Sequence, residues 1–406
     1  MRVLFIPLAV ASHYYPMVPL AWALRTAGHE VCVAAQPGVA DAVVRSGMPV
    51  CTVGASFDLF AGLGRAQEVM REETGRSLAG FGEMSAIPED VRRRYVAARN
   101  AAHTGAAVAM ADELIAFARS WRPDVIVCDV VALVGPLVAE VLGVPLVYQA
   151  WGPQLPAMVR FPGHGAPVDS WPAELRALYE RFGATPRAVG GVLTVDPCPP
   201  SLHVHELPNQ LVTRFVPYNG STVVPDWLRT PPERPRVGVS WSVSNFAHLS
   251  GQKPPLAVVV EALEGLGADV VVTAAAQDRA ALGPVPPGVR VEEGLPLNLV
   301  AATCSVAVNH AGAGTMLTVA AAGVPQVMLP QEPGQLRNAE TVAAVGAGTL
   351  IRGPQTDPVR IRAAVQALLA ERHWAEAARK LRDENAAQTT PAEAARVIAE
   401  LVAARE

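Results

Sequence analysis

Three polar side chains stand where α/β proteins commonly place reactive groups, at the ends of short apolar runs. His13 and His310 each follow such a run closely, and Asp129 is the last residue of another. Runs of this kind are typical of buried strands, and side chains past the carboxyl ends of parallel strands line ligand sites. An imidazole titrates near neutral pH and can remove a proton from a hydroxyl group. A carboxylate behind it fixes its tautomer and stabilises its protonated form.

Position alone leaves plainer interpretations of these residues open. His13 could serve only to cap the helix that follows it in the chain. Asp129 could be the N-cap of a helix predicted over Val134–Leu142, because Asp is a favoured N-cap residue. His13 and Asp129 could therefore be a catalytic base with its carboxylate, or two helix caps.

The segment His310–Thr315 has the composition of a phosphate-binding turn. It lies between a predicted strand and an apolar helix predicted over Met316–Ala322. Gly312 and Gly314 carry no Cβ, so the backbone can approach a ligand closely. The helix N-terminus adds unpaired N–H groups and a partial positive charge, and the ring and hydroxyl at the two ends of the turn add donors. On glycine spacing alone, an ordinary strand–helix turn is an equally good interpretation.

Two named phosphate motifs do not fit this turn. A Walker loop requires Lys and then Ser or Thr after the last glycine, whereas Thr315 and Met316 stand there. The dinucleotide fingerprint requires Gly or Ala where this chain has Leu317. The turn is therefore assigned to neither motif.

The elements that must position these residues repeat in two halves. Strands predicted over Arg2–Pro7 and Glu30–Ala35 enclose a helix over Met17–Thr26, which indicates a parallel βαβ unit. The pattern restarts with a strand over Arg236–Ser240, directly after the proline-rich segment Pro231–Pro235. The expected fold class is therefore α/β, with two Rossmann-like domains.

Composition excludes several classes of partner. Of the 406 residues, half are hydrophobic and 17% are charged, and the net charge is −4. No dense basic run occurs, so nucleic acid is not an expected partner. The apolar run Val3–Ile6 is too short for a signal peptide or a membrane helix, so we expect a cytoplasmic protein without a membrane association. The five cysteines include no C-x-x-C pair and are expected to be reduced thiols.

Several spaced elements carry a family resemblance. His310-x-Gly-x-Gly-Thr is followed by Gly-Val-Pro, Pro-Gln, Gln-x-x-Asn-Ala and Gly-x-Gly, in this order within residues 310–348. This run resembles the nucleotide-sugar signature of GT-B glycosyltransferases of the family 1-like type. More narrowly, it is similar to the actinobacterial branch that glycosylates antibiotics and other polyketides. The segment from His13 to Val31 resembles the N-terminus of the same branch.

The resemblance implies a GT-B architecture, in which two Rossmann-like domains face each other across a cleft. Residues 1–210 would form the acceptor-binding domain, 211–235 the linker and 236–375 the nucleotide-sugar-binding domain. The helical tail, residues 376–406, would pack on the first domain, with its last helix crossing back. Residues 57–104 show no regular period, and in the resembled family this region forms loops and helices over the acceptor.

The resemblance also implies roles for individual residues. His13 would be the general base, oriented by Asp129. The diphosphate of a nucleotide sugar would meet the glycine-rich turn, with His310 donating a hydrogen bond. The candidates are His13 and Asp129 for catalysis; His310, Gly312, Ala313, Gly314, Thr315, Leu295, Ser242, Thr318, Glu332 and Gln335 for the donor; and Tyr14, Met84, Trp151 and Gln154 for the acceptor.

Three departures from the family pattern bear on the donor. UDP-sugar enzymes of the family commonly have Glu where this chain has Thr318, to hold both ribose hydroxyls, so its absence favours a TDP donor. The usual Asp-Gln pair that holds sugar hydroxyls appears as Gly334-Gln335, which fits a deoxysugar or a weakened activity, and Glu332 could substitute. The loop Trp241–Ser244 lacks the glycine that relatives typically have there.

The expected activity is inverting transfer of a deoxysugar from a TDP-sugar to a hydroxyl group of an apolar aglycone, expected to be a polyketide. No D-x-D sequence and no cluster with metal-ligand spacing occurs, so no metal and no other cofactor is expected. The expected partners are the sugar donor and the aglycone. Whether the protein forms a homodimer, and whether the sugar is attached through oxygen or carbon, are left open. Two other functions also stay open: a non-catalytic auxiliary protein and a nucleotide-sugar epimerase of the same fold.

Overall fold

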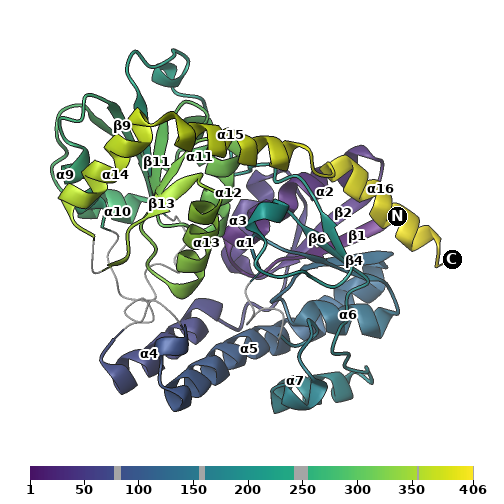
Figure 1. Ribbon diagram of the computed structural model, residues 1–406. Helices are drawn as coiled ribbons and strands as arrows, with labels where there is room; N and C mark the ends of the chain where they lie inside the picture. Colours follow the sequence, from purple (N-terminus) through teal and green to yellow (C-terminus); the bar gives the residue numbers. More distant parts are fainter. Residues whose placement is uncertain (77–83, 155–160, 242–254, 354–355, 406) are drawn as a thin grey trace.

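The computed structural model describes residues 1–76, 84–154, 161–241, 255–353 and 356–405. Two parallel sheets, one in each half of the chain, are connected by a linker and by the C-terminal helices (Figure 1). The α/β class, the two Rossmann-like domains and the return of the last helix to the first domain are thereby confirmed.

The first sheet contains seven strands within the described residues, in the order β3-β2-β1-β4-β5-β6-β7, and neighbouring strands pair in parallel. The strands are β1 Arg2–Ile6, β2 Glu30–Ala35, β3 Val50–Thr52, β4 Val125–Asp129, β5 Leu146–Gln149, β6 Leu193–Asp196 and β7 Gln210–Val212. The helices are α1 Ala11–Tyr14, α2 Val18–Thr26, α3 Pro37–Arg45, α4 Leu59–Thr74, α5 Glu89–Trp121, α6 Val134–Leu142 and α7 Ala173–Arg181.

The side chains of β1 show why this sheet is buried on both faces. Leu4 and Ile6 belong to a hydrophobic cluster with α5 and α6, whereas Val3 and Phe5 belong to another with α2 and the C-terminal helix. Successive side chains of a strand point to opposite faces, so a continuous apolar strand needs helices on both sides. The run that sequence analysis identified as a buried strand is therefore central in the sheet.

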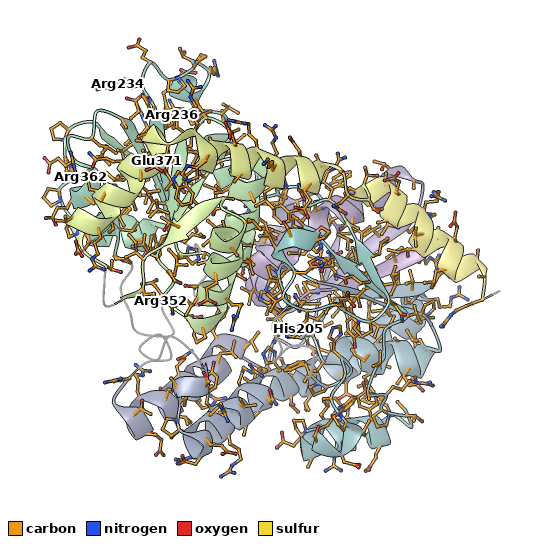
Figure 2. The ribbon with its side chains drawn as sticks, in the orientation of Figure 1. His205, Arg234, Arg236, Arg352, Arg362 and Glu371 are labelled. Carbon is orange, nitrogen blue, oxygen red and sulfur yellow. The ribbon has the colours of Figure 1, made fainter. Side chains whose placement is uncertain are left out.

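The second sheet contains six strands in the described part of the chain, in the order β10-β9-β8-β11-β12-β13, all parallel. Arg362 links two helices around it by donating to the carbonyls of Ala262, Glu264 and Gly265 (Figure 2). The strands are β8 Arg236–Ser240, β9 Asp269–Ala274, β10 Val289–Glu293, β11 Val306–Asn309, β12 Gln326–Met328 and β13 Gly348–Leu350. The helices are α9 Leu256–Leu263, α10 Ala276–Ala281, α11 Leu297–Ala301, α12 Ala313–Ala322, α13 Pro333–Ala344, α14 Pro358–Ala370, α15 Arg372–Ala386 and α16 Pro391–Ala403.

The sequence predicts an amphipathic helix over Ala106–Trp121, but helix α5 is much longer. It begins at Glu89 and packs along α4, in a region whose sequence shows no regular period. The two helices approach closely because the contact uses small residues: a Cβ on Gly62 would lie 2.9 Å from the Cβ of Ala102. Glycine and alanine give only a weak apolar period, which hides the helix in the sequence.

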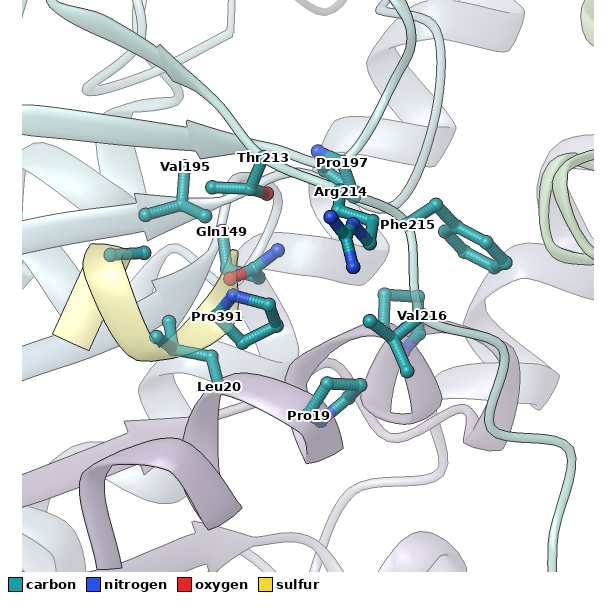
Figure 3. A pocket seen from close by; sticks show the side chains of 12 residues that line it. Pro19, Leu20, Gln149, Val195, Pro197, Thr213, Arg214, Phe215, Val216 and Pro391 are labelled. Atoms are coloured by element: carbon teal, nitrogen blue, oxygen red, sulfur yellow. The ribbon is translucent and has the colours of Figure 1, made fainter. Parts of the chain in front are cut away.

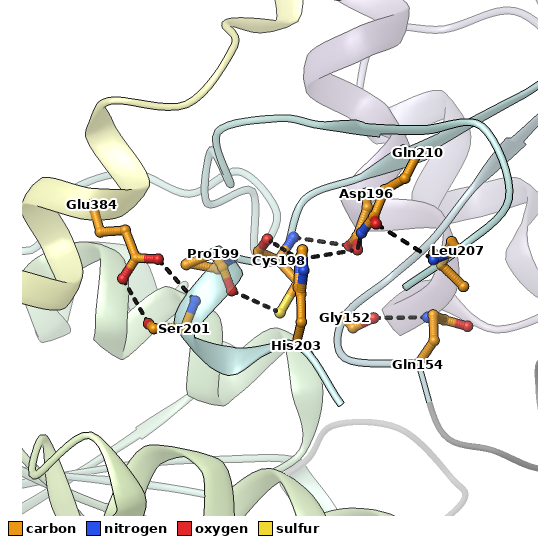
Figure 4. Close-up of polar contacts among 10 residues, drawn as sticks. All are labelled: Gly152, Gln154, Asp196, Cys198, Pro199, Ser201, His203, Leu207, Gln210 and Glu384. Atoms are coloured by element: carbon orange, nitrogen blue, oxygen red, sulfur yellow. Dashed lines mark hydrogen bonds and ion pairs between the residues drawn. The ribbon is translucent and has the colours of Figure 1, made fainter. Parts of the chain in front are cut away.

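The exit from the first sheet is organised by a buried carboxylate at the end of β6. Asp196 accepts hydrogen bonds from the Cys198 N–H at 3.0 Å and the Gln210 side chain at 2.6 Å, and His203 Nε2 lies 3.3 Å from it (Figure 4). Burial raises the pKa of Asp196 to about 6. The sequence predicts the last strand of the first domain over Thr194–Pro199, but β7 follows it and extends the sheet two residues into the expected linker.

The linker and the break between α15 and α16 form one hydrogen-bonded unit. The Asn385 side chain accepts from the Phe215 N–H at 2.8 Å and donates to the Phe215 carbonyl at 3.1 Å. Glu384 accepts from the N–H and hydroxyl of Ser201 at 2.8 and 2.6 Å (Figure 4). Hydrogen bonds thus connect the two segments in which the chain passes between the domains, the linker and the α15–α16 break.

The C-terminal tail divides between the domains. α15 packs against α12 of the second domain, and only α16 packs against α2 of the first (Figure 1). The tail expected to pack on the first domain from residue 376 is therefore shared: Ala378 and Leu381 of α15 also cluster with Cys198 and Leu202 of the first domain, and α16 packs on that domain further along. Thr390 starts this helix with a capping box, in which its side chain and that of Glu393 bond each other's backbone N–H groups.

A small pocket lies at the seam between α16 and the first domain (Figure 3). Pro19 and Leu20 of α2, Gln149 of β5 and Pro391 of α16 line it, together with residues of the linker. Most of these side chains are proline or aliphatic, so we regard the pocket as part of the packing seam.

Candidate active site

His13 and Asp129 meet because their strands are neighbours. β1 pairs with β4, and the strand order proceeds in opposite directions from this pair, which is where open α/β sheets bind ligands. The Nδ1 atom of His13 lies 2.8 Å from Oδ2 of Asp129, whose side chain is fully buried. Donation by Nδ1–H leaves the basic lone pair on Nε2, as a general base requires.

The contacts of Asp129 decide between the two interpretations of this carboxylate. Its second oxygen accepts the Val131 N–H at 2.9 Å, while the N-cap of α6 is Leu133, so Asp129 does not cap that helix. The sequence predicts a loop over Ala11–Pro16, but His13 lies in the short helix α1. Pro16, which has no N–H, ends the α-helical hydrogen bonding after it.

The loop after β5 joins this pair to the second domain. The ring centroids of Trp151 and His13 are 4.2 Å apart, with an angle of 40° between the planes. The next residue, Gly152, packs so closely that a Cβ there would lie 2.6 Å from the Cβ of Ala313. Gln154 is buried and donates to the Gly152 carbonyl at 2.7 Å (Figure 4). The structure therefore brings the pair close to the first turn of α12.

Buried amide side chains hold the turn before α12. The Ala311 N–H donates to Asn309 Oδ1 at 2.7 Å, and the Ala311 carbonyl accepts from Asn338 at 2.9 Å. Asn309 in turn donates to Gln326 at 2.9 Å. Ala311 has a φ of 60°, a conformation that residues other than glycine rarely adopt. The surrounding hydrogen bonds maintain this strained backbone.

Helix α12 begins at Ala313, three residues before the start expected at Met316. Its N-cap is Gly312, which has no side chain that could cap the helix. The Met316 N–H donates to the Gly312 carbonyl at 2.8 Å. The N–H groups of Ala313, Gly314 and Thr315 have no hydrogen-bond partner within the described ranges. Unpaired N–H groups and the helix dipole make this end suitable for an anion.

His310 is enclosed beneath this turn. Its side chain contacts the ring of Trp241, with 5.7 Å between centroids, and bonds to the backbone of Ser240. Burial lowers the pKa of His310 to about 4, so the ring is neutral at pH 7. A neutral ring carries one N–H and one lone pair. The Nδ1 atom has no hydrogen-bond partner in the described part of the chain.

Thr318 is buried against the linker. Its hydroxyl donates to the Gly314 carbonyl at 2.7 Å and lies 3.3 Å from the amide nitrogen of Asn219. The Asn219 oxygen also accepts the Asn298 N–H at 3.1 Å, at the start of α11. Sequence reasoning missed Asn219 because it lies in a linker and belongs to no motif.

The candidates Gln335 and Glu332 lie at the start of α13. Gln335 accepts the Gln331 N–H at 2.8 Å, and the Gln331 side chain accepts the indole N–H of Trp241 at 3.0 Å. Gln335 thus supports the wall that encloses His310. Burial raises the pKa of the Glu332 carboxyl to about 7.

The remaining candidates are Tyr14, Leu295, Ser242 and Met84. Tyr14 was expected near the acceptor, but it is fully buried and its hydroxyl lies 2.6 Å from that of Ser46, so it belongs to the core of the first domain. In a helix, neighbouring side chains point in different directions, and α1 turns Tyr14 inward. Leu295 is buried in a small apolar cluster. Ser242 and the side chain of Met84 lie outside the described residues.

Sequence reasoning also missed a polar row on α5. Tyr95, Arg99 and His103 are spaced four residues apart, which places them on one face of the helix. Burial first, and then the charges of Arg99 and His13, lower the pKa of His103 to about 3. The row therefore leads towards the His13–Asp129 pair. The spacing was visible in the sequence, but only once α5 was known to start at Glu89.

The described residues form neither a metal-binding cluster nor a disulfide. Among the described residues, no three His, Cys, Asp or Glu side chains lie together as a metal site would require. All five cysteines are described, and none forms a disulfide. Within the ranges given above, no helix has both the length and the apolar character needed to span a bilayer.

Two family models match consecutive parts of the chain. The model described as erythromycin biosynthesis protein CIII-like, N-terminal domain, matches residues 22–242. The corresponding C-terminal domain model matches residues 257–401. Together the two matches cover every strand of both sheets except β1.

Individual proteins are similar over nearly the whole chain. 10-deoxymethynolide desosaminyltransferase from Streptomyces venezuelae is 34% identical over 416 residues, covering 97% of this chain and 95% of the relative. TDP-daunosamine transferase DnrS from Streptomyces peucetius is 34% identical over 408 residues, covering 95% and 93%. The solved structure of spinosyn rhamnosyltransferase SpnG complexed with thymidine diphosphate matches with a TM-score of 0.78 and 30% identity, covering 98% of this chain and 100% of that chain.

Proposed function

The chain belongs to the erythromycin biosynthesis protein CIII-like family and is a GT-B glycosyltransferase, and we propose that it transfers a deoxysugar from a TDP-sugar to a polyketide hydroxyl group. The observation that carries this proposal is the His13–Asp129 pair, 2.8 Å apart and joined through Gly152 to the N-terminus of α12. A base and an anion site thus lie close together, as transfer from a nucleotide sugar requires.

In the proposed mechanism, His13 is the general base. Its Nε2 atom takes the proton of the acceptor hydroxyl while that oxygen attacks the anomeric carbon of the sugar. The bond from this carbon to the diphosphate oxygen breaks, and its electron pair leaves with TDP. Attack opposite the leaving group inverts the configuration, and Asp129 stabilises the imidazolium ion that forms.

The departing diphosphate would bind at the first turn of α12. A helix terminus stabilises an anion by roughly 0.3–2 kcal/mol, so several backbone N–H groups must act together. The unpaired N–H groups of Ala313, Gly314 and Thr315 support this role. We propose that His310 shapes the turn and that its ring N–H donates to the diphosphate.

The nature of the donor is proposed from both sequence and relatives. Thr318 carries no carboxylate for a second ribose hydroxyl, and Asn219 occupies the space beside it. One relative is named a TDP-daunosamine transferase, and one similar structure contains thymidine diphosphate. The acceptor would approach His13 beside Trp151, whose ring offers an apolar surface.

Calorimetric titration with TDP and UDP tests the donor. We expect the wild type to bind TDP more tightly, and Thr318→Glu to shift the preference towards UDP by offering a carboxylate to the 2′-hydroxyl. Thr222→Glu, an exposed change of the same kind in the linker, is the control and should leave the preference unchanged. Binding of neither nucleotide would show that the anion site at α12 is misassigned.

Product analysis tests the reaction. With TDP-deoxysugars and a panel of polyketide aglycones, we expect TDP release that depends on the aglycone, and NMR should show inversion at the anomeric carbon. His13→Asn should retain TDP binding and lose transfer. An epimerase would instead convert the nucleotide sugar without any aglycone, and an auxiliary protein would bind TDP without turnover, so either result would replace the proposal.

A further inference from the structure

One face of α5 carries polar groups that the proposed reaction has not used. Arg99 and His103 lie one helical turn apart on this face, and the charge of His13 acts on His103, so the row ends beside the proposed base. At its other end, burial raises the pKa of Tyr95 to about 12, and the nearby charges of Arg99 and Glu332 act on it in opposite directions. The row thus extends from the base towards the second domain.

His103 is buried with one unsatisfied ring nitrogen. Its side chain is 7% exposed, packs edge-on against Phe161 with 5.3 Å between centroids, and bonds to the backbone of Val131. Its Nδ1 atom has no hydrogen-bond partner among the residues that the structure describes. A neutral ring carries one N–H and one lone pair, so Nδ1 is an acceptor in the tautomer that has its proton on Nε2.

Arg99 supplies the complementary group. Its guanidinium lies 5.9 Å from the centre of the Phe161 ring, and among the described residues it makes only a long hydrogen bond, to Asn100 at 3.4 Å. No described carboxylate lies within ion-pair distance, and the Nε atom is buried without a partner. Burial lowers the pKa of Arg99, but an arginine remains charged at pH 7. Buried donors and acceptors are normally paired, so an unpaired donor beside an unpaired acceptor needs an explanation.

We infer that Arg99 and His103 form an acceptor subsite that binds a hydroxyl group and an adjacent carbonyl or enolate oxygen on the aglycone. The hydroxyl would donate to His103 Nδ1, and the second oxygen would accept from Arg99. A β-hydroxycarbonyl or an ortho-acylphenol presents this pair of oxygens. The inference rests on the proposed function, because it takes the region beside His13 as the acceptor site.

Such a subsite would determine which hydroxyl group meets the base. An aglycone would otherwise be held by apolar surface such as the ring of Trp151, which fixes its orientation poorly. Two directional hydrogen bonds at one end of the molecule would fix its orientation relative to His13. Arg99 and His103 are in this sense specificity-determining residues and take no part in bond breaking.

Binding of small matched probes to the full chain tests the subsite. The probes are 1-acetyl-2-naphthol, its analogue 1-ethyl-2-naphthol without the carbonyl, and its methyl ether without the hydroxyl proton. The variants are Arg99→Met, which keeps length and removes the donors, and His103→Gln, whose amide can still donate to Val131 while Nδ1 is lost. Arg93→Met, an exposed change of the same kind on α5, is the control. Fluorescence titration gives the affinities, and TDP binding is measured on every variant.

The wild type should bind 1-acetyl-2-naphthol about tenfold more tightly than either analogue, since each analogue leaves one buried polar group unpaired. Arg99→Met should abolish the preference over the ethyl analogue, and His103→Gln the preference over the methyl ether, while Arg93→Met keeps both. Equal binding of all three probes by the wild type, or preferences that survive both substitutions, would overturn the subsite. TDP binding separates the two proposals: if TDP binds and the preferences are absent, only the subsite is wrong, whereas loss of TDP binding by the wild type contradicts the function itself.

Discussion

At the scale of single residues, the pairing of His13 with Asp129 gives each side chain a defined state. The buried carboxylate has two partners, the imidazole at 2.8 Å and the Val131 N–H at 2.9 Å, so its position is fixed before any ligand binds. The imidazole in turn has one nitrogen engaged by the carboxylate. Proton transfer through such a pair depends on the charge of the carboxylate as well as on its shape.

Asp129→Asn tests that dependence. An amide can occupy the same space, but it can donate to Nδ1 and so hold the ring in the wrong tautomer, and it cannot stabilise an imidazolium ion. We expect kcat to fall by about a hundredfold to ten-thousandfold with TDP affinity unchanged. Asp112→Asn, an exposed carboxylate on α5, is the control. A kcat within about threefold of wild type would remove Asp129 from the mechanism.

The buried His310 should make folding sensitive to acid. Its pKa is about 4 in the folded protein and near 6.5 in an unfolded chain, so between these values the unfolded state binds a proton that the folded state does not. The contribution of neutral His310 to the free energy of unfolding should therefore be fully present above pH 6.5. It should fall by up to about 3 kcal/mol as the pH drops to 4. Urea unfolding at several pH values should show a shallower decline for His310→Gln. The exposed His205→Gln should retain the wild-type slope (Figure 2).

At the scale of elements, the turn between β11 and α12 is built around a close contact between backbone and ring. A Cβ on Gly312 would overlap the Nε2 atom of His310, which is held between Ser240 and Trp241. The glycine is therefore needed for packing as well as for ligand approach. It sits at the N-cap, so any shift there moves the first turn of the helix.

Gly312→Ala should accordingly weaken TDP binding. The added methyl group forces the ring or the turn to move, and misdirected N–H groups should raise the Kd for TDP by about tenfold. Gly353→Ala, where a Cβ would meet nothing within 4 Å, serves as the control. In a His310→Ala background the added methyl should cost much less, and calorimetry of the four proteins measures this coupling. Equal losses in both backgrounds would mean that the contact with His310 is not the cause.

At the scale of the whole molecule, the two domains meet where the chemistry is proposed. Gly152 of the first domain packs on Ala313 of the second, while the linker and the α15–α16 break hold the domains together by hydrogen bonds such as those of Asn385 with Phe215. The helices that cross between the domains are seen in Figure 1. The distance between base and leaving group therefore depends on domain packing.

Gly152→Ala changes that distance directly. Its Cβ would lie 2.6 Å from that of Ala313, so the loop and α12 must separate by on the order of 1 Å. Misplacement of this size can cost about a hundredfold in rate, and we expect kcat to fall by that order while the melting temperature changes little. Gly38→Ala, in the same domain, controls for the substitution type, because a Cβ there would lie 3.9 Å from its nearest neighbour, the Ala9 carbonyl oxygen. Steady-state kinetics gives kcat, and thermal unfolding gives the melting temperature, for both variants. An unchanged kcat in Gly152→Ala would show that the contact does not set the reaction geometry.

The sequence alone determined the fold class and the strands that precede His13 and His310 and end at Asp129, because continuous apolar runs and glycine-rich turns depend on local composition. It also indicated the family, through spaced motifs between residues 310 and 348. Only the tertiary structure decided that Asp129 bonds His13 and does not cap a helix, that Tyr14 points into the core, and that the row on α5 ends beside the base. Those facts depend on contacts between segments far apart in the chain, such as the pairing of β1 with β4 and the packing of small residues between α4 and α5. Local patterns carry no information about such contacts until the sheet order and the helix packing are known.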